Sequence, residues 1–120
     1  MKKTLFNAYV LLGSNLQDPL QQVITALTDL SRINRTQVIK VSHFYKTKAL
    51  GPNEQPDYIN AVAALNTELT AHEILKELLD IEVQHGRSRE VRWGARTLDL
   101  DLLLYVGQHV VNNRQLPNDI

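Results

Sequence analysis

Residues 86–101 carry the side chains with the clearest chemical potential in the chain. Four arginines fall within ten residues of this segment: Arg87, Arg89, Arg92 and Arg96. The planar guanidinium group binds phosphate oxygens in bidentate fashion, so the cluster predicts phosphate binding. A solvated charged loop is the open alternative. Trp93 could stack on a base, although a single tryptophan more often only packs.

Asp99 and Asp101 lie in the leucine-rich run 98–105, whose length suits a buried strand. Alternate side chains of a strand share a face, so the two carboxylates point one way and Leu98 and Leu100 point the other. Two residues of strand rise separate the aspartate backbones by about 6.5 Å. Mg²⁺ accepts one or two carboxylates together with water and substrate phosphates, and a pair could share two ions. An edge strand with a solvated polar face is the open alternative.

The charge balance of the chain limits the classes of partner. Thirteen basic residues offset thirteen acidic ones, which disfavours general binding to nucleic acid or to an anionic membrane surface. The absence of cysteine excludes a disulfide framework and a thiolate metal site. The sequence shows neither a signal peptide nor a membrane-spanning run. We therefore expect a cytoplasmic protein with one domain over 1–120, as a monomer, with a dimer left open.

Hydrophobic periodicity predicts the elements that must position these residues. Strands are expected at 8–12, 37–45, 57–66 and 98–105, with a short return strand at 109–111. One helix should begin at Asp18, with Gln21 completing a capping box, and another at Thr70 with Glu73. The expected buried helix positions are Leu20, Val23, Ile24, Leu27, Leu30, Ile74, Leu75, Leu78, Leu79 and Ile81. This order predicts an α+β, ferredoxin-like βαββαβ sandwich with both helices on one face of an antiparallel sheet.

Polar residues near a long expected loop form a second group of interest. Tyr58 and Asn60 share a strand face beside the loop 47–56. They could hold a flat heteroaromatic ring by stacking and amide pairing, or Tyr58 could be core and Asn60 could cap a neighbouring backbone group. The loop itself is either functional or a decorative insertion. Glu82, in the last turn of the second helix, is either an exposed glutamate or an acceptor facing the site.

Six short motifs are spread over nearly the whole chain: Gly13-Ser14-Asn15-Leu16, Phe44-Tyr45-x-Thr47, Leu50-Gly51-Pro52, Gln55-Pro56-Asp57-Tyr58-x-Asn60, Gly86-Arg87-x-Arg89 and Arg92-Trp93-Gly94-x-Arg96-Thr97-Leu98-Asp99-Leu100-Asp101. In content and in order they resemble the motifs of the 6-hydroxymethyl-7,8-dihydropterin pyrophosphokinase family of folate biosynthesis. The last motif is highly specific, whereas the first alone would be weak. The resemblance implies transfer of diphosphate from ATP to the pterin hydroxymethyl group, with release of AMP.

The resemblance also implies a set of site residues. Two Mg²⁺ ions would be held by Asp99 and Asp101, which with Arg87 and Arg96 would form the catalytic group. The ATP site would include Glu82, Arg89, Arg92, Trp93 and Arg114. The pterin pocket would include Thr47, Leu50, Tyr58 and Asn60.

Some positions depart from the family pattern. Lys48, Leu79 and Asn118 stand where the family usually has proline, a polar residue and histidine. Family members also continue for several dozen residues past Ile120, so we expect either a truncated sequence or a shortened relative with altered activity. A shortened paralogue that binds pterin or nucleotide without turnover is therefore one rival function. An RNA-binding module of the same topology is another, disfavoured by the few strand aromatics and the zero net charge.

Overall fold

The computed structural model describes residues 4–16, 18–49, 51, 55–86, 98–111 and 114–115. Its elements are β1 (Thr4–Ser14), α1 (Pro19–Ser31), β2 (Thr36–Val41), β3 (Tyr45–Thr47), β4 (Tyr58–Thr67), α2 (Ala71–Gln84), β5 (Asp99–Val111) and β6 (Arg114–Gln115). The strands form an antiparallel sheet in the order β2-β4-β1-β5-β6, and β3 pairs with β4. The chain therefore places its first and last long strands, β1 and β5, side by side.

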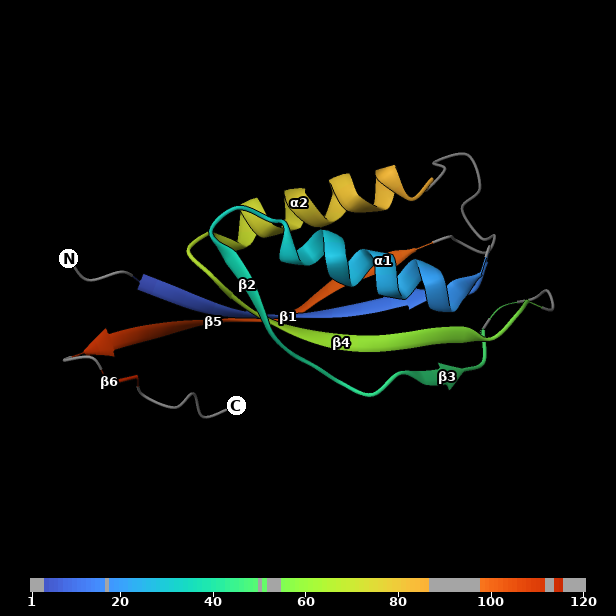
Figure 1. The fold of residues 1–120 in the computed structure, drawn as a ribbon, viewed down its shortest axis with the longest axis horizontal. Coiled ribbons are helices and arrows are strands. Elements are labelled where there is room, and N and C mark those ends of the chain that lie inside the picture. Colours follow the sequence, from blue (N-terminus) through green and yellow to red (C-terminus); the bar gives the residue numbers. More distant parts are fainter. Residues whose placement is uncertain are drawn as a thin grey trace.

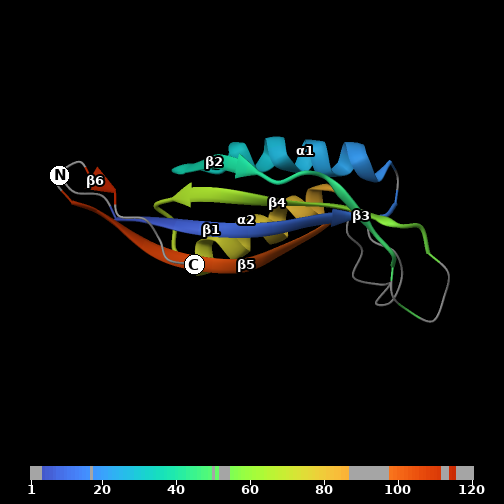
Figure 2. The same cartoon turned by 90° about the horizontal axis from the view of Figure 1, so that it is seen from below.

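Two layers make up the fold. Both helices lie on the same face of the sheet, as Figures 1 and 2 show. Between the layers, side chains from the sheet and the helices are fully buried, among them Leu12 of β1, Leu65 of β4, Leu30 of α1 and Ile74 of α2. This arrangement confirms the predicted ferredoxin-like α+β class. Neither helix of the described chain is long and apolar enough to cross a membrane.

Strand alternation separates a core face of the sheet from an open face. Val10 and Leu12 of β1 are buried beneath the helices, as are Leu98 and Leu100 at the start of β5. Because side chains alternate along a strand, Asp99 and Asp101 point to the opposite side of the sheet from these leucines. The prediction that the aspartates and the flanking leucines point in opposite directions is confirmed.

The helices bury narrower stripes than the periodicity predicted. The buried apolar positions are Val23, Ala26, Leu30, Ile74, Leu78 and Ile81. Four residues predicted to be buried are instead exposed, namely Leu20 at 47%, Ile24 at 42%, Leu75 at 46% and Leu79 at 55%. A helix packed on one sheet face covers only the residues nearest that sheet, so apolar residues at the margin of the stripe stay in contact with solvent.

The two predicted helix starts have different outcomes. At α2, the Thr70 hydroxyl accepts the Glu73 N–H, and the Glu73 carboxylate accepts the Thr70 N–H, which confirms the capping box. At α1 the helix begins as predicted, with Asp18 at the N-cap position and Pro19 in the first turn, but the predicted capping box is wrong, because Asp18 adopts a left-handed conformation with φ of 62° and makes no side-chain cap. Gln21 instead donates to Thr25 within the helix. Only α2 thus begins with the predicted reciprocal bonds.

The α2 capping box predicts a dependence of stability on pH. The backbone hydrogen bond from Thr70 lowers the pKa of Glu73 below its usual value of 4.5. A lowered folded-state pKa stabilises the fold above pH 4.5, and this contribution is lost as the pH falls through the folded pKa. We expect Glu73→Gln to lower the free energy of unfolding at pH 7 and to show less acid sensitivity than the parent protein. Urea unfolding followed by circular dichroism between pH 7 and pH 3 measures this, with Thr70→Ser, which keeps the hydroxyl, as control. Parallel pH profiles of E73Q and the parent protein would contradict it.

Two strand predictions differ from the structure. The predicted strand 37–45 is divided into β2 and β3, because the regular ladder to β4 is interrupted at Ser42: the Val62 N–H of β4 donates to the Ser42 hydroxyl at 2.8 Å. The predicted return strand at 109–111 is instead the end of β5, which continues through Gly107 opposite Phe6 of β1. A glycine that keeps its pairing to a neighbouring strand does not end the strand.

Candidate active site

One row of residues crosses three strands on the open face of the sheet. Gly13 of β1 lies directly opposite Asn60 of β4 on one side and Asp99 of β5 on the other. Two residues earlier in β1, Leu11 lies opposite Asp101. Directly opposed residues of neighbouring strands project to the same face. Strand pairing thus brings an amide and two carboxylates, about forty positions apart in sequence, onto a single surface.

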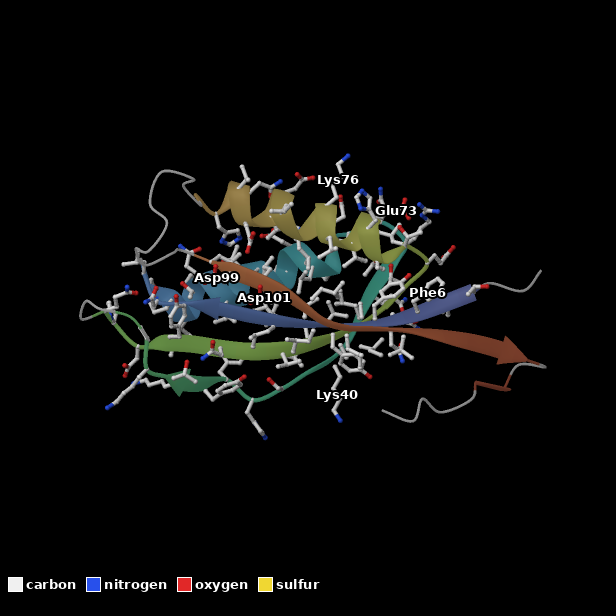
Figure 3. All side chains as sticks on the ribbon, turned by 180° about the vertical axis from the view of Figure 1, so that it is seen from behind. Phe6, Lys40, Glu73, Lys76, Asp99 and Asp101 are labelled. Atoms are coloured by element: carbon white, nitrogen blue, oxygen red, sulfur yellow. The ribbon has the colours of Figure 1, made fainter. Side chains whose placement is uncertain are left out.

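A pocket of about 350 Å³ covers this row. Its lining residues are Leu11, Gly13, Thr47, Lys48, Tyr58, Asn60, Asp99 and Asp101. Figure 3 labels the two aspartates, which lie along β5 on this surface. Asp99 is half-buried and Asp101 is exposed. The pocket therefore combines an apolar and amide-bearing wall with a negatively charged wall that solvent and ligands can reach.

The amide of Asn60 is held in a defined orientation. The residue is only 8% exposed, and its Nδ2 donates to the Thr47 hydroxyl at 2.8 Å and to the Tyr45 carbonyl at 3.5 Å. Since both bonds engage the nitrogen, they fix which end of the amide points where. A buried, oriented amide is suited to recognise a ring that presents complementary donors and acceptors.

Gly13 leaves the space that this amide occupies. A Cβ atom at position 13 would lie 2.9 Å from Asn60 Oδ1 and 3.6 Å from Tyr58 Cδ1. Contact at 2.9 Å is too close, so a larger residue would displace the Asn60 side chain. The glycine is therefore required by the close approach of β4 side chains to the β1 backbone.

We expect Gly13→Ala to weaken binding at this pocket without unfolding the protein. Displacement of the Asn60 amide costs part of one hydrogen bond, which corresponds to about threefold to tenfold in the Kd of a pocket ligand. Gly107→Ala is the matched control, because its Cβ would meet only the Phe6 ring at 3.6 Å, an ordinary contact. Calorimetric titration of both variants with 6-hydroxymethylpterin, a ligand of the class that the sequence resemblance implies, tests this. Equal affinities of G13A and G107A would show that the close approach does not matter.

Asn15, which lies in the first motif of the sequence, supports the site by bonding to the chain segment before β4. It is 1% exposed, and its Nδ2 donates to Gln55 Oε1 at 3.2 Å and to the Pro56 carbonyl at 3.1 Å. These bonds fasten the chain before β4 to the end of β1. Lys48, Leu11 and Gly13 were also missed as lining residues. Strand alternation puts Leu11 and Gly13 on one face of β1, but it does not say which strand pairs beside them.

Glu82 is buried, and its carboxylate bonds to the backbone of β5 beside the pocket. It is 3% exposed, and its Oε2 accepts the Leu100 N–H at 2.8 Å. The alternative of an exposed glutamate is therefore wrong. Glu82 is a hydrogen-bond acceptor, but the bonded oxygen faces the β5 backbone and the residue does not line the pocket. The N–H group that Glu82 accepts belongs to Leu100, the residue between Asp99 and Asp101.

Several predicted site residues cannot be compared with the pocket. Outside the described residues lie Leu50, Arg87, Arg89, Arg92, Trp93 and Arg96. The backbone of Arg114 belongs to β6, at the far end of β5 from Asp99. Five predicted residues do meet at the pocket: Thr47, Tyr58, Asn60, Asp99 and Asp101.

The two carboxylates at the pocket, Asp99 and Asp101, suit a cation that also binds a phosphate ligand. Within the described ranges, no three histidine, aspartate or glutamate side chains gather as a complete protein site. Two carboxylates on one strand face are instead what Mg²⁺ uses when phosphate and water fill its remaining positions. Asp99 and Asp101 therefore fit a phosphate-bound Mg²⁺ and do not fit a cage made of protein ligands alone.

Comparisons of the sequence with known proteins show which proteins this chain is similar to. The sequence model of 7,8-dihydro-6-hydroxymethylpterin-pyrophosphokinase (HPPK) matches residues 9–119. The chain is similar to the 2-amino-4-hydroxy-6-hydroxymethyldihydropteridine pyrophosphokinase of Haemophilus influenzae, with 49% identity over 93% of this chain and 69% of that protein. The proteins of the same name from Pseudomonas aeruginosa and Bacillus subtilis are 47% and 38% identical, over 81% and 86% of this chain. The matches span 60% and 62% of those two relatives.

Proposed function

Because the chain belongs to the 7,8-dihydro-6-hydroxymethylpterin-pyrophosphokinase family of ATP-dependent diphosphotransferases, we propose that it transfers diphosphate from ATP to 6-hydroxymethyl-7,8-dihydropterin. The products are AMP and the pterin diphosphate, in folate biosynthesis. The observation that carries the proposal is the single pocket in which Asn60 and Tyr58 stand across Gly13 from Asp99 and Asp101. One half of this pocket suits a flat ring, and the other half suits a phosphate-bound cation.

The ring half of the pocket orients the acceptor substrate. Tyr58 provides an aromatic wall, and the fixed amide of Asn60 pairs with the hydrogen-bonding edge of the pterin. Thr47 both lines the pocket and holds the amide, so loss of its hydroxyl would loosen recognition. Leu50 belongs to the same proposed set. These contacts would direct the hydroxymethyl group towards the aspartate wall.

The aspartate half of the pocket receives the triphosphate. Asp99 and Asp101 would hold two Mg²⁺ ions, which when bound with ATP offset the negative charge of its phosphates. We assign Arg87 and Arg96 to the phosphates as well. The remaining nucleotide contacts are proposed for Glu82, Arg89, Arg92, Trp93 and Arg114.

The proposed reaction moves one diphosphate group. The hydroxymethyl oxygen of the pterin attacks the β-phosphorus of ATP and releases its proton to water, while the bond from that phosphorus to the α,β-bridging oxygen breaks. The bridging oxygen leaves with AMP. In this direct transfer the diphosphate passes from ATP to the pterin without bonding to the protein, so the residues of the chain act by positioning and by electrostatic stabilisation of the transferred group.

An assay of AMP release tests the proposal. The purified chain is incubated with ATP, MgCl₂ and 6-hydroxymethyl-7,8-dihydropterin, and AMP is measured with and without the pterin. We expect AMP and pterin diphosphate in equal amounts only when all three are present. Pterin binding without AMP release would replace the proposal by that of a binding module. The proposal further assumes a cytoplasmic monomer that engages neither nucleic acid nor membrane.

A further inference from the structure

The last turn of α2 contacts the aspartate strand through Glu82. Within the described chain, β5 pairs with β6 only at Val110 and Val111, so the outer edge of β5 meets no strand at Leu100. The Glu82 carboxylate accepts the Leu100 N–H at this edge. A buried N–H without an acceptor is costly, so this carboxylate takes the place of a neighbouring strand. Through Leu100 it sets the backbone from which Asp99 and Asp101 project.

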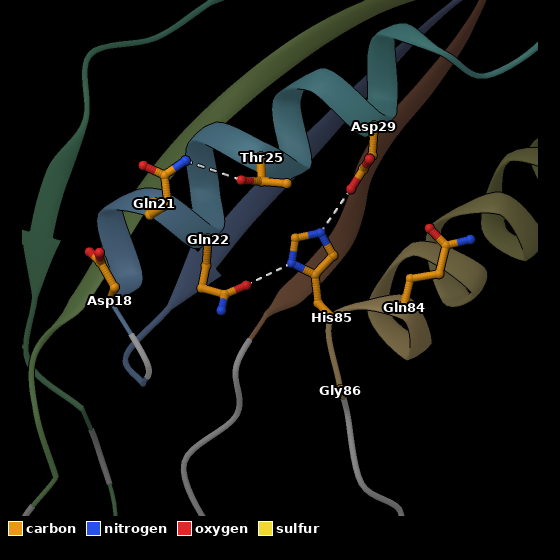
Figure 4. Close-up of a pocket in the computed structure, with 8 residues that line it drawn as sticks. All are labelled: Asp18, Gln21, Gln22, Thr25, Asp29, Gln84, His85 and Gly86. Carbon is orange, nitrogen blue, oxygen red and sulfur yellow. Dashed lines mark hydrogen bonds and ion pairs between the residues drawn. The ribbon is translucent and has the colours of Figure 1, made fainter.

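The same turn of α2 contacts α1 through His85. The His85 ring is 7% exposed and lies between two α1 side chains, with Nε2 2.8 Å from Asp29 Oδ2 and Nδ1 2.7 Å from Gln22 Oε1. Figure 4 shows the ring directed from the end of α2 towards α1 with both contacts. A carboxylate only accepts, so Nε2 donates to Asp29. The Gln22 amide has a donor and an acceptor, so it can match Nδ1 in either form.

Backbone bonds connect these two contacts within one helical turn. The His85 N–H donates to the carbonyls of Ile81 at 3.1 Å and of Glu82 itself at 3.2 Å. A displacement of His85 would therefore be transmitted to Glu82. The chain of contacts runs from α1 through His85 and Glu82 to Leu100.

We propose that His85 is a positioning residue for the aspartate pair. By fastening the last turn of α2 to Asp29 and Gln22 of α1, it holds Glu82 against Leu100 and so fixes the directions of the two carboxylates. This inference rests on the proposed function in that it takes the aspartates to be phosphate-site residues. Buried partners that orient site ligands typically contribute about tenfold to a hundredfold to metal affinity or activity.

The alternative is that His85 only joins two helices. Its loss would then destabilise the whole domain and would raise the exchange rates of all protected amides together. A positioning role predicts a local effect at Leu100 instead. Hydrogen exchange at single amides separates the two, because it reports the opening of each hydrogen bond.

The experiment compares His85→Ala and Asp29→Ala with Gln21→Ala by amide hydrogen exchange. Gln21 lines the same pocket of about 610 Å³ as Gln22, Asp29 and His85, but among the described residues its side chain bonds only to Thr25 of its own helix. We expect the Leu100 amide to exchange about tenfold faster in both H85A and D29A, and the core amides of β1 to change less than about twofold. Q21A should match the parent protein. Because Asp29 is partly exposed, D29A decides the question if H85A does not fold.

Two further readouts complete the test. In the AMP-release assay, H85A and D29A should lose about tenfold in kcat with the pterin KM within about twofold. His85→Gln, which can still donate to Asp29, should recover part of the Leu100 protection. Unchanged Leu100 exchange, or an equal acceleration of all amides, would overturn the proposal. Absence of AMP release by the parent protein would instead count against the proposed function, since the exchange arm does not depend on turnover.

Discussion

Asp101→Asn should lower the rate of diphosphate transfer by about 10²–10³-fold. Asparagine keeps the shape and one oxygen of aspartate but removes the negative charge, so it is a poor ligand for Mg²⁺. Asp101 is exposed on the open sheet face, and the substitution should leave the fold intact. Pterin affinity should stay within about twofold, because the ring half of the pocket is separate from this side chain.

The measurement is kcat by AMP release, together with calorimetric titration of pterin. Asp99→Asn should behave in the same way, since Asp99 lines the same pocket two residues away on β5. Asp80→Asn serves as control, because Asp80 is an exposed carboxylate on α2 that does not line this pocket. A D101N protein that keeps more than about half of the parent rate would remove the carboxylate pair from the proposed mechanism.

Asn60→Ala should weaken pterin binding by about tenfold to a hundredfold, which corresponds to one or two lost hydrogen bonds in a buried site. The substitution removes the oriented amide and also leaves the Thr47 hydroxyl without its 2.8 Å partner. The KM for ATP should change little, because Asn60 lies on the opposite side of Gly13 from Asp99. The effect should therefore be confined to one substrate.

Calorimetric titration of pterin, with and without a non-hydrolysable ATP analogue, measures the affinity of this variant. Val62→Ala is the matched control on the same strand face, because Val62 is half-buried and does not line the pocket. An unchanged pterin Kd in N60A would contradict the assignment of the amide. An equal loss in V62A would indicate that the strand, and not the amide, is responsible.

Local patterns in the sequence predicted the parts of the site that lie on single strands. Alternation alone places Asp99 and Asp101 on the face opposite the leucines, and Tyr58 and Asn60 together on β4, as the structure confirms. It does not predict that Gly13 separates Asn60 from Asp99. That proximity depends on which strands pair and in which register, which are long-range properties of the sheet.

The errors at the helices also have long-range causes. A period of 3.6 identified the apolar side of each helix, but the centre of the buried stripe depends on how the helix sits on the sheet. Leu20 and Leu79 therefore stay exposed despite their spacing. The Asp18 cap failed because the backbone there is left-handed, a conformation that an aspartate permits but does not dictate. Glu82 could not be assigned to Leu100 from sequence, since eighteen positions separate them.

The alignment of Asn60, Gly13 and Asp99 across three strands limits where this chain can tolerate the insertion or deletion of a residue. Neighbouring strands of a sheet lie about 4.8 Å apart, so two ladders hold the Asn60 and Asp99 backbones roughly 10 Å from each other. One residue inserted into β1 between Leu11 and Gly13 would slip the pairing and turn the glycine towards the helices. The two halves of the pocket would then no longer share a face. Insertions and deletions should therefore be accepted only in segments outside these three strands, whatever residues they contain.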